Sequence, residues 1–143
     1  MLGWLVFALL SAVFAALVAI FGKIGLQNVD SHTATAIRAI VMAVFLIAIV
    51  FIEGKLTNFK TIIINNKAMF YIVLSGIAGA LSWLFYFVAL KGAKVSQIVP
   101  IDRLSVVFAL LLAFIFLGEK VSWQSWVGGG LIVIGGIIIA LAK

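Results

Sequence analysis

Cysteine is absent from this 143-residue sequence, and histidine, proline and acidic residues are scarce. The lack of cysteine excludes disulfides, thiolate metal sites and a cysteine nucleophile. The one histidine, His32, cannot build a metal site alone. No nucleophile–base pair and no glycine-rich phosphate loop are visible. The sequence therefore indicates a protein that is not an enzyme and binds no metal and no cofactor.

Charge is also scarce, because only 10% of the residues are charged and 66% are hydrophobic. A soluble domain has about 25% charged and about 45–50% apolar residues, so this composition predicts an integral membrane protein. The net charge of +6 would suggest nucleic acid in a soluble protein. Here the lysines flank the hydrophobic runs, where they contact lipid headgroups, so we expect membrane lipids and no nucleic acid as partners.

Long apolar runs account for most of the chain. Each is close to the ~20 residues that a membrane-spanning helix needs, and the expected helices cover residues 2–21, 33–52, 68–90, 96–117 and 123–142. The links between them are short, so residues 1–143 form one all-α domain of a multi-pass protein of the cell (inner or plasma) membrane. The longest link, 53–67, has an apolar centre that we expect at the membrane interface.

The lysines are divided almost evenly between the two sides of the predicted bundle. Residues 55, 60, 67 and 120 fall on one side, and residues 23, 91, 94 and 143 on the other. Cytoplasmic loops of membrane proteins normally carry an excess of Lys and Arg, which sets their orientation. A balanced count gives the insertion machinery little basis for a choice. The sequence therefore predicts that the chain inserts in both orientations.

The stretch VPIDRLSVVFALLLAFIFLGEKVSWQSWVGGGLIVIGG, from Val99 to Gly136, resembles the C-terminal part of an EamA-type repeat of the drug/metabolite transporter superfamily. The matching features are a proline early in the fourth helix, Gly118-Glu119 closing it, and a glycine-rich fifth helix. The resemblance implies a secondary transporter. Most members carry two repeats in tandem, the second inverted, whereas this chain has one. The resemblance together with the single repeat implies an antiparallel homodimer, with the substrate site at the interface between the two copies.

Three charged residues interrupt the apolar runs: Arg38, Asp102 and Arg103. Each charge inside a span costs about 2.5–3.5 kcal/mol on insertion scales, so such residues usually serve a function. All three lie roughly 8–10 Å below the same surface at 1.5 Å per helical residue. They form a structural ion pair, a substrate site, or a proton-coupling site at Asp102. Nearby Pro100 predicts a kink in the fourth helix.

Small and aromatic residues mark faces of two other helices. Ser75, Gly79, Ser82 and Tyr86 share one stripe of 68–90, with Trp83 beside it. Close helix packing is the expected role of Ser75 and Gly79, whereas Ser82, Trp83 and Tyr86 are candidates for the wall of a ligand cavity. The last helix carries a face for helix packing or dimer contact made of Ser125, Gly129, Gly136 and Ala140.

We therefore expect a secondary transporter of a small polar or amphipathic metabolite or drug-like solute, working by alternating access. Its substrate site would comprise Arg38, Asp102 and Arg103 for charge and Ser82, Trp83 and Tyr86 as walls. Two alternatives stay open. The chain is a non-transporting subunit for a second, paralogous repeat, or it is a flippase for a lipid-linked substrate.

Overall fold

The structure is a computed structural model and describes residues 3–142. It is 85% helical, with no strand among the residues described. Five stretches are long and apolar enough to cross a membrane: Gly3–Gly25, Ser31–Ile52, Asn66–Gly92, Val95–Phe116 and Trp123–Leu141. The all-α membrane fold with five spans, expected from the sequence, is confirmed. The expected first residue of the first helix and Lys143 lie outside the described residues.

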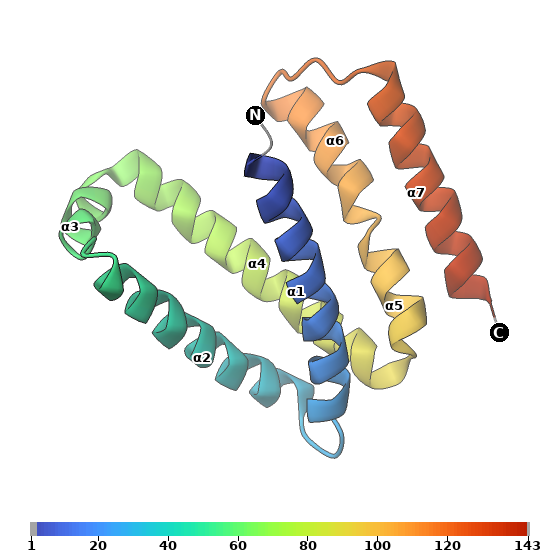
Figure 1. Cartoon of the computed structure of the whole chain (residues 1–143), viewed down its shortest axis with the longest axis horizontal. Coiled ribbons are helices and arrows are strands. Elements are labelled where there is room, and N and C mark those ends of the chain that lie inside the picture. Colours follow the sequence, from blue (N-terminus) through green and yellow to red (C-terminus); the bar gives the residue numbers. More distant parts are fainter. Residues whose placement is uncertain (1–2, 143) are drawn as a thin grey trace. The chain divides into compact units, whose positions relative to one another are not determined.

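One compact unit comprises residues 25–91. It contains α2 (Ser31–Ile52), α3 (Thr57–Ile64) and most of α4 (Asn66–Gly92). Helices α2 and α4 run in opposite directions, and α3 joins their ends (Figure 1). Helix α2 is capped by Asp30, whose carboxylate accepts hydrogen bonds from the backbone amide (2.7 Å) and hydroxyl (2.9 Å) of Thr33. Those bonds satisfy a donor that has no partner inside the helix.

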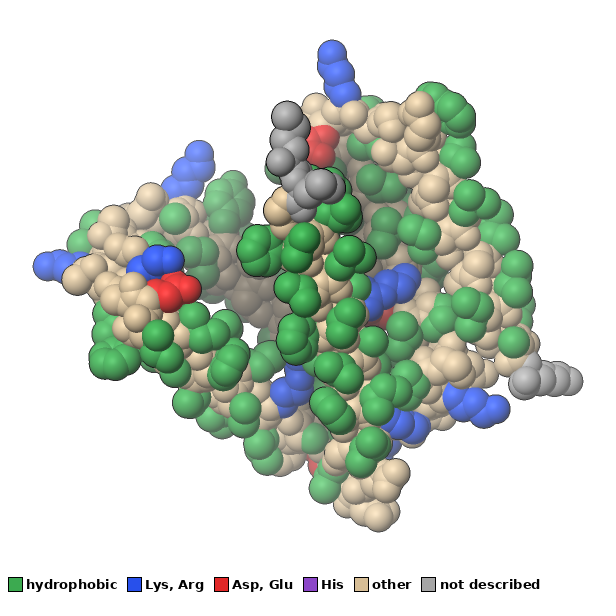
Figure 2. All heavy atoms as spheres, viewed as in Figure 1, with side chains coloured by type: hydrophobic (Ala, Val, Ile, Leu, Met, Phe, Trp, Pro, Cys, Tyr) green, Lys and Arg blue, Asp and Glu red, His purple; other side chains and the backbone are tan. Residues whose placement is uncertain are grey.

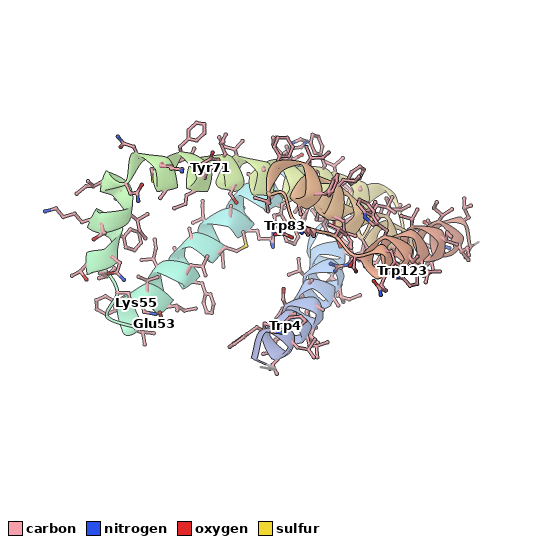
Figure 3. All side chains as sticks on the ribbon, turned by 90° about the horizontal axis from the view of Figure 1, so that it is seen from above. Trp4, Glu53, Lys55, Tyr71, Trp83 and Trp123 are labelled. Atoms are coloured by element: carbon pink, nitrogen blue, oxygen red, sulfur yellow. The ribbon has the colours of Figure 1, made fainter. Side chains whose placement is uncertain are left out.

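The link that precedes α4 is partly helical. The sequence predicted a loop over 53–67, whereas α3 forms eight helical residues in it, Thr57–Ile64. Gly54 permits the preceding turn, because its φ of +68° is a conformation that costs glycine little. Glu53 and Lys55 lie next to each other in this turn (Figure 3) and form an ion pair of 2.8 Å. The apolar centre of the link is thus the exposed face of a short helix.

The second compact unit comprises the described residues 3–24 and 92–142. It contains most of α1 (Gly3–Gly25), α5 (Val95–Asp102), α6 (Ser105–Phe116) and α7 (Trp123–Leu141). Helix α7 lies antiparallel beside α5 and α6 (Figure 1). The ammonium group of Lys23, near the end of α1, donates to the backbone carbonyl of Ala93 at 2.8 Å. This bond ties α1 to the turn before α5.

The fourth span consists of two helices, although the sequence predicted one kinked helix over 96–117. Helix α5 ends at Asp102 and α6 starts at Ser105. Pro100 has no backbone N–H, so the helical bond of that residue is missing. Beyond it the backbone hydrogen bonds span three residues instead of four. The Leu104 amide donates to the Ile101 carbonyl (3.0 Å), and the Val107 amide donates to the Leu104 carbonyl (3.0 Å). The proline therefore leads to a break rather than a kink.

Little apolar surface is buried within the chain. Among the described residues, the buried apolar side chains are those of Ala19, Leu26, Phe87 and Leu90. Large apolar side chains at the opposite extreme include Trp4 (72% exposed) and Phe116 (78%), and hydrophobic side chains cover much of the face shown in Figure 2. Such a surface is stable against lipid tails or another apolar protein surface, not against water.

Candidate functional site

Helices α2 and α4 of the unit 25–91 border a groove of about 670 Å³. This volume is typical of pockets that bind small molecules, which occupy about 300–1,000 Å³. The side of α4 contributes small, large aliphatic and aromatic residues. The small ones are Ser75, Gly76, Gly79 and Ala80, the aliphatic ones are Ile72, Leu81 and Leu84, and the aromatic one is Trp83. The side of α2 contributes the polar and ionisable groups His32, Thr35 and Arg38, together with Ala36, Ala39 and Met42.

Arg38 and Trp83 form the central contact of the groove. The guanidinium carbon of Arg38 lies 3.7 Å from the centroid of the Trp83 ring and 5.2 Å from that of Phe87. Figure 3 marks Trp83 on α4. Its ring is held in turn by Tyr86, edge to face at 5.5 Å, and by Phe87 at 5.8 Å. Three aromatic rings on one face of α4 therefore surround this contact: Trp83 and Phe87 face the guanidinium, and Tyr86 packs against Trp83.

The stack leaves the hydrogen-bonding edges of Arg38 available. Within the unit 25–91, its side chain has no hydrogen bond and no ion pair with a described residue. The two carboxylates of that unit have other partners, since Asp30 accepts from Thr33 and Glu53 pairs with Lys55. A guanidinium that is stacked by its face keeps five N–H donors in its plane. The groove thus presents donors for an acceptor that this unit does not supply.

Helical spacing explains why these residues share the groove. On α2 the positions 32, 35, 38, 39 and 42 recur every three or four residues, and so do 72, 75, 76, 79, 80 and 83 on α4. A Cβ atom added at Gly76 or Gly79 would meet nothing within 4 Å. The small residues of α4 therefore leave space instead of filling a close helix contact.

The structure brings together two of the six residues that the sequence predicted as a substrate site. Arg38 and Trp83 line the groove. Tyr86 supports Trp83 from the side, and Ser82 is exposed and not among the lining residues. Lining positions that the sequence reasoning missed include His32 and Thr35. The steps of three residues from His32 to Thr35 and from Thr35 to Arg38 are the signal that could have found them.

The other two charged candidates, Asp102 and Arg103, belong to the second unit. They lie at the break between α5 and α6, immediately after the turn that contains Pro100. Both side chains are exposed, and within their own unit neither forms a hydrogen bond or ion pair with a described residue. Opposite charges on adjacent residues are thus displayed at the interruption of a span.

The glycine face of α7 packs against α5 and α6 of the same chain. A Cβ at Gly136 would lie 3.0 Å from the carbonyl oxygen of Pro100, and one at Gly129 would lie 3.2 Å from Leu110. Near the end of the helix, Gln97 donates to the carbonyl of Ala140 at 3.5 Å. Ser125, on the same face, is bonded instead to the cap residue Ser122, at 2.9 Å between the hydroxyls. Both glycines are buried by this contact.

Comparison with known proteins assigns the chain to a family. The EamA-like transporter family matches residues 2–141. The chain belongs to this family. A Sinorhizobium protein named "uncharacterized transporter in cobO 3'region" is 38% identical over 138 residues, which cover 96% of both chains. An uncharacterized protein of Methanocaldococcus jannaschii is 28% identical over 89 residues, covering 62% of this chain and 65% of its own. No solved structure gives a significant match.

Membership of the EamA-like transporter family confirms the resemblance found in the fourth and fifth spans. The protein is a multi-pass membrane transporter of the drug/metabolite transporter superfamily. The Sinorhizobium relative is matched over 96% of its length, so it too is about one repeat long. The groove beside Arg38 is the candidate solute site of this EamA-like transporter.

Proposed function

We propose that this EamA-like protein is a secondary transporter that carries a small polar or amphipathic solute by alternating access across the cell membrane. The observation that carries the proposal is the groove of about 670 Å³ between two membrane spans, with Arg38 stacked on Trp83. A charge in a span is costly and marks substrate pathways. Here it borders an open volume in a chain of a transporter family.

The break in the fourth span is proposed to serve the same transport cycle. Asp102 and Arg103 follow the α5 turn that contains Pro100, where the helix is interrupted. Interrupted spans are common where secondary transporters bind solutes and ions. We propose Asp102 and Arg103 as the solute-contacting charges of their own unit. In the unit 25–91 we propose Arg38 for the same role, with Trp83, Tyr86 and Ser82 as wall residues.

We further propose that two copies in opposite orientations form the working transporter. The sequence contains one repeat, and its lysines are balanced four against four between the two sides. A large apolar surface is left exposed by the single chain; α1, for example, buries only Ala19 of its 23 residues. Inverted repeats around a central site are the general arrangement of secondary transporters, and an antiparallel pair supplies that symmetry.

The absence of cysteine makes the orientation directly measurable. Gln27→Cys and Asn65→Cys place single thiols at exposed positions in links on opposite sides of the membrane. Intact cells would be labelled with a membrane-impermeant maleimide before and after permeabilisation. We expect roughly half of each variant to label from outside. Complete labelling of one and none of the other would overturn the antiparallel homodimer and favour a parallel assembly or a paralogous partner.

Transport itself is tested in proteoliposomes. They would be offered tritiated amino acids, carboxylic acids and amines, and counterflow against the unlabelled compound would be measured. We expect saturable counterflow of at least one compound, lost in Arg38→Ala and Asp102→Asn while the dimer persists on size exclusion. Counterflow that survives both changes removes these residues from the mechanism. No counterflow of any compound would favour a non-transporting subunit.

A further inference from the structure

The ionisable groups that line the groove are both of the basic kind, and no carboxylate is among the lining residues. They are His32 and Arg38, both on α2 and separated by nearly two helical turns. Asp30, which lies outside the lining, interacts electrostatically with His32. The positive charge of the groove is therefore mainly that of Arg38, which attracts anions and repels cations. The charge of the groove therefore favours anionic ligands over cationic ones.

Arg38 has the geometry of a receptor for an oxyanion. Stacking on Trp83 at 3.7 Å fixes the plane of its guanidinium. Its N–H donors then point outward from the stack in a rigid fork, the arrangement that binds carboxylate or phosphate oxygens in pairs. Within the unit 25–91 no described carboxylate or carbonyl takes these donors.

The rest of the groove fits an apolar body. Apart from the hydroxyls of Thr35 and Ser75, the lining beyond the two basic residues is aliphatic, glycine or Trp83. Gly76 and Gly79 open the space further, since a Cβ at either would meet nothing within 4 Å. A ligand of this site thus combines one anionic end with an uncharged carbon skeleton.

We propose that the groove binds an amphipathic organic anion, with its carboxylate or phosphate on Arg38 and its apolar part against α4. The proposal rests on the transport function proposed above and names its substrate class. The same chemistry is found in a soluble metabolite and in the headgroup of an anionic lipid. We assign the soluble anion, because the volume of about 670 Å³ matches a small molecule.

Three probes of one shape test the charge preference: 1-naphthaleneacetate, its neutral amide, and the naphthylmethyl trimethylammonium cation. Binding would be measured by isothermal titration calorimetry on the full chain in phosphatidylcholine nanodiscs. We expect the anion to bind at least about tenfold more tightly than the other two, as expected for charge-assisted hydrogen bonds. Equal or tighter binding of the amide or the cation, or no binding of any probe, would overturn the proposal.

Variants assign the preference to Arg38. Arg38→Gln should weaken the anion about tenfold or more and leave the amide unchanged, because only the anion uses the charge. Arg38→Lys keeps the charge without the fork and should give an intermediate affinity, which also guards against a folding defect in the glutamine variant. Lys67→Gln removes an exposed charge outside the groove and should change nothing. An anion affinity that is the same in all four proteins would contradict the assignment.

Two further arms identify other occupants. If a carboxylate from outside the unit 25–91 already neutralises Arg38, naphthaleneacetate will not bind to the unaltered protein, and the proposal fails. Recovery of binding in Asp102→Asn would identify that carboxylate as the one at position 102. If the natural anion is a lipid headgroup, phosphatidylglycerol in the nanodiscs will abolish binding of the probe, which overturns the choice of a soluble anion.

The outcome is separable from that of the transport assay. Saturable counterflow of a cation that does not depend on Arg38 would preserve the transporter and remove the anion site. Tight, Arg38-dependent binding of the anion without any counterflow would do the reverse.

Discussion

The α2–α4 pair and the α5–α7 hairpin both carry small residues on helix faces, yet they use them in opposite ways. In the hairpin, a Cβ at Gly136 would lie 3.0 Å from the backbone of Pro100, so glycine permits the close approach of two helices. In the α2–α4 pair, Gly76 and Gly79 face open space. The same residue type produces a close contact in one unit and a groove in the other.

The difference lies in the residues that the small ones face. Across from Gly136, α5 offers the carbonyl of Pro100, which does not project beyond the backbone. In the other unit the large side chains of Arg38 and Trp83 meet, with their groups stacked at 3.7 Å. The two stacked side chains keep the backbones of α2 and α4 apart, so these helices cannot pack closely where the stack lies. A stripe of small residues therefore has a meaning only together with the surface opposite.

The largest effect is expected from Gly136→Leu. The new side chain would collide with backbone, which cannot rotate away, so α7 must move off α5. Overpacking of this kind destabilises by about 1–3 kcal/mol, and we expect the upper end of that range. The free energy of unfolding would be measured by titration with sodium dodecyl sulfate in mixed micelles.

The neighbouring Gly135→Leu is the matched control for this variant. A Cβ at Gly135 meets nothing within 4 Å, so the same change should be tolerated there. Equal loss of stability in both variants would show that glycine matters for α7 through its backbone and not through contact with α5.

Gly79→Leu should have the contrasting effect in the groove. Because a Cβ there has open space, stability should be kept or should rise by up to about 1 kcal/mol, as glycine is a poor helix former. The added side chain occupies the volume of the groove, so the affinity for naphthaleneacetate should fall about tenfold or more. Calorimetry and the detergent titration measure the two quantities on one preparation.

Ala78→Leu is the control for the groove, because Ala78 is exposed and does not line it. It should leave both quantities unchanged. If Gly79→Leu unfolds the protein as readily as Gly136→Leu, the helices α2 and α4 meet closely at this level and the contrast between the two units disappears.

The spans could be predicted from sequence because about 20 apolar residues are enough to cross a bilayer, whatever they contact. Arg38 and Trp83 could be selected because a charge and an aromatic ring in a span need a reason. The groove could not be predicted. Ser75 and Gly79 follow the same four-residue spacing as Ser125 and Gly129, and sequence alone does not show which surface each pair faces.

Two further features depend on local backbone energetics that hydropathy does not register. The proline predicted a disturbance in the fourth span. The position of the break at 103–104, however, depends on which three-residue hydrogen bonds replace the helical bond that Pro100 cannot donate. The short α3 forms within a link of mixed polarity, where helical and loop conformations differ little in free energy.

The contact between Arg38 and Trp83 should have a measurable coupling energy. A double-mutant cycle with Arg38→Gln and Trp83→Leu isolates it from the separate cost of each change. Cation–π pairs contribute about 0.5–1 kcal/mol when exposed and about 2 when desolvated, so we expect a coupling in that range. Phe85→Leu, at a residue that is 67% exposed, replaces Trp83→Leu in the control cycle and should show no coupling. Equal coupling energies in the two cycles would mean that the contact between Arg38 and Trp83 makes no specific contribution to stability.

The smallest effect distinguishes the starts of the helices in the two units. Helix α7 is capped by the neutral hydroxyl of Ser122, which accepts from the Ser125 amide at 3.2 Å, whereas α2 is capped by the Asp30 carboxylate. Hydrogen bonds from the amide and hydroxyl of Thr33 lower the pKa of Asp30 below its ordinary value near 3.8. The charged form is therefore the one that stabilises the folded state.

Melting temperatures as a function of pH should separate the two caps. The loss of stability caused by Asp30→Ala should have its full size above the unfolded pKa near 3.8 and should shrink as the pH falls below that value and through the lower folded pKa. Ser122→Ala should lower the free energy of unfolding by about 1 kcal/mol at every pH, because a hydroxyl does not titrate in this range. If the Asp30→Ala difference stays constant down to about pH 2.5, the carboxylate is not the stabilising form and the cap acts through a neutral hydrogen bond. The two units would then begin their helices by the same physical means, even though they pack by different ones.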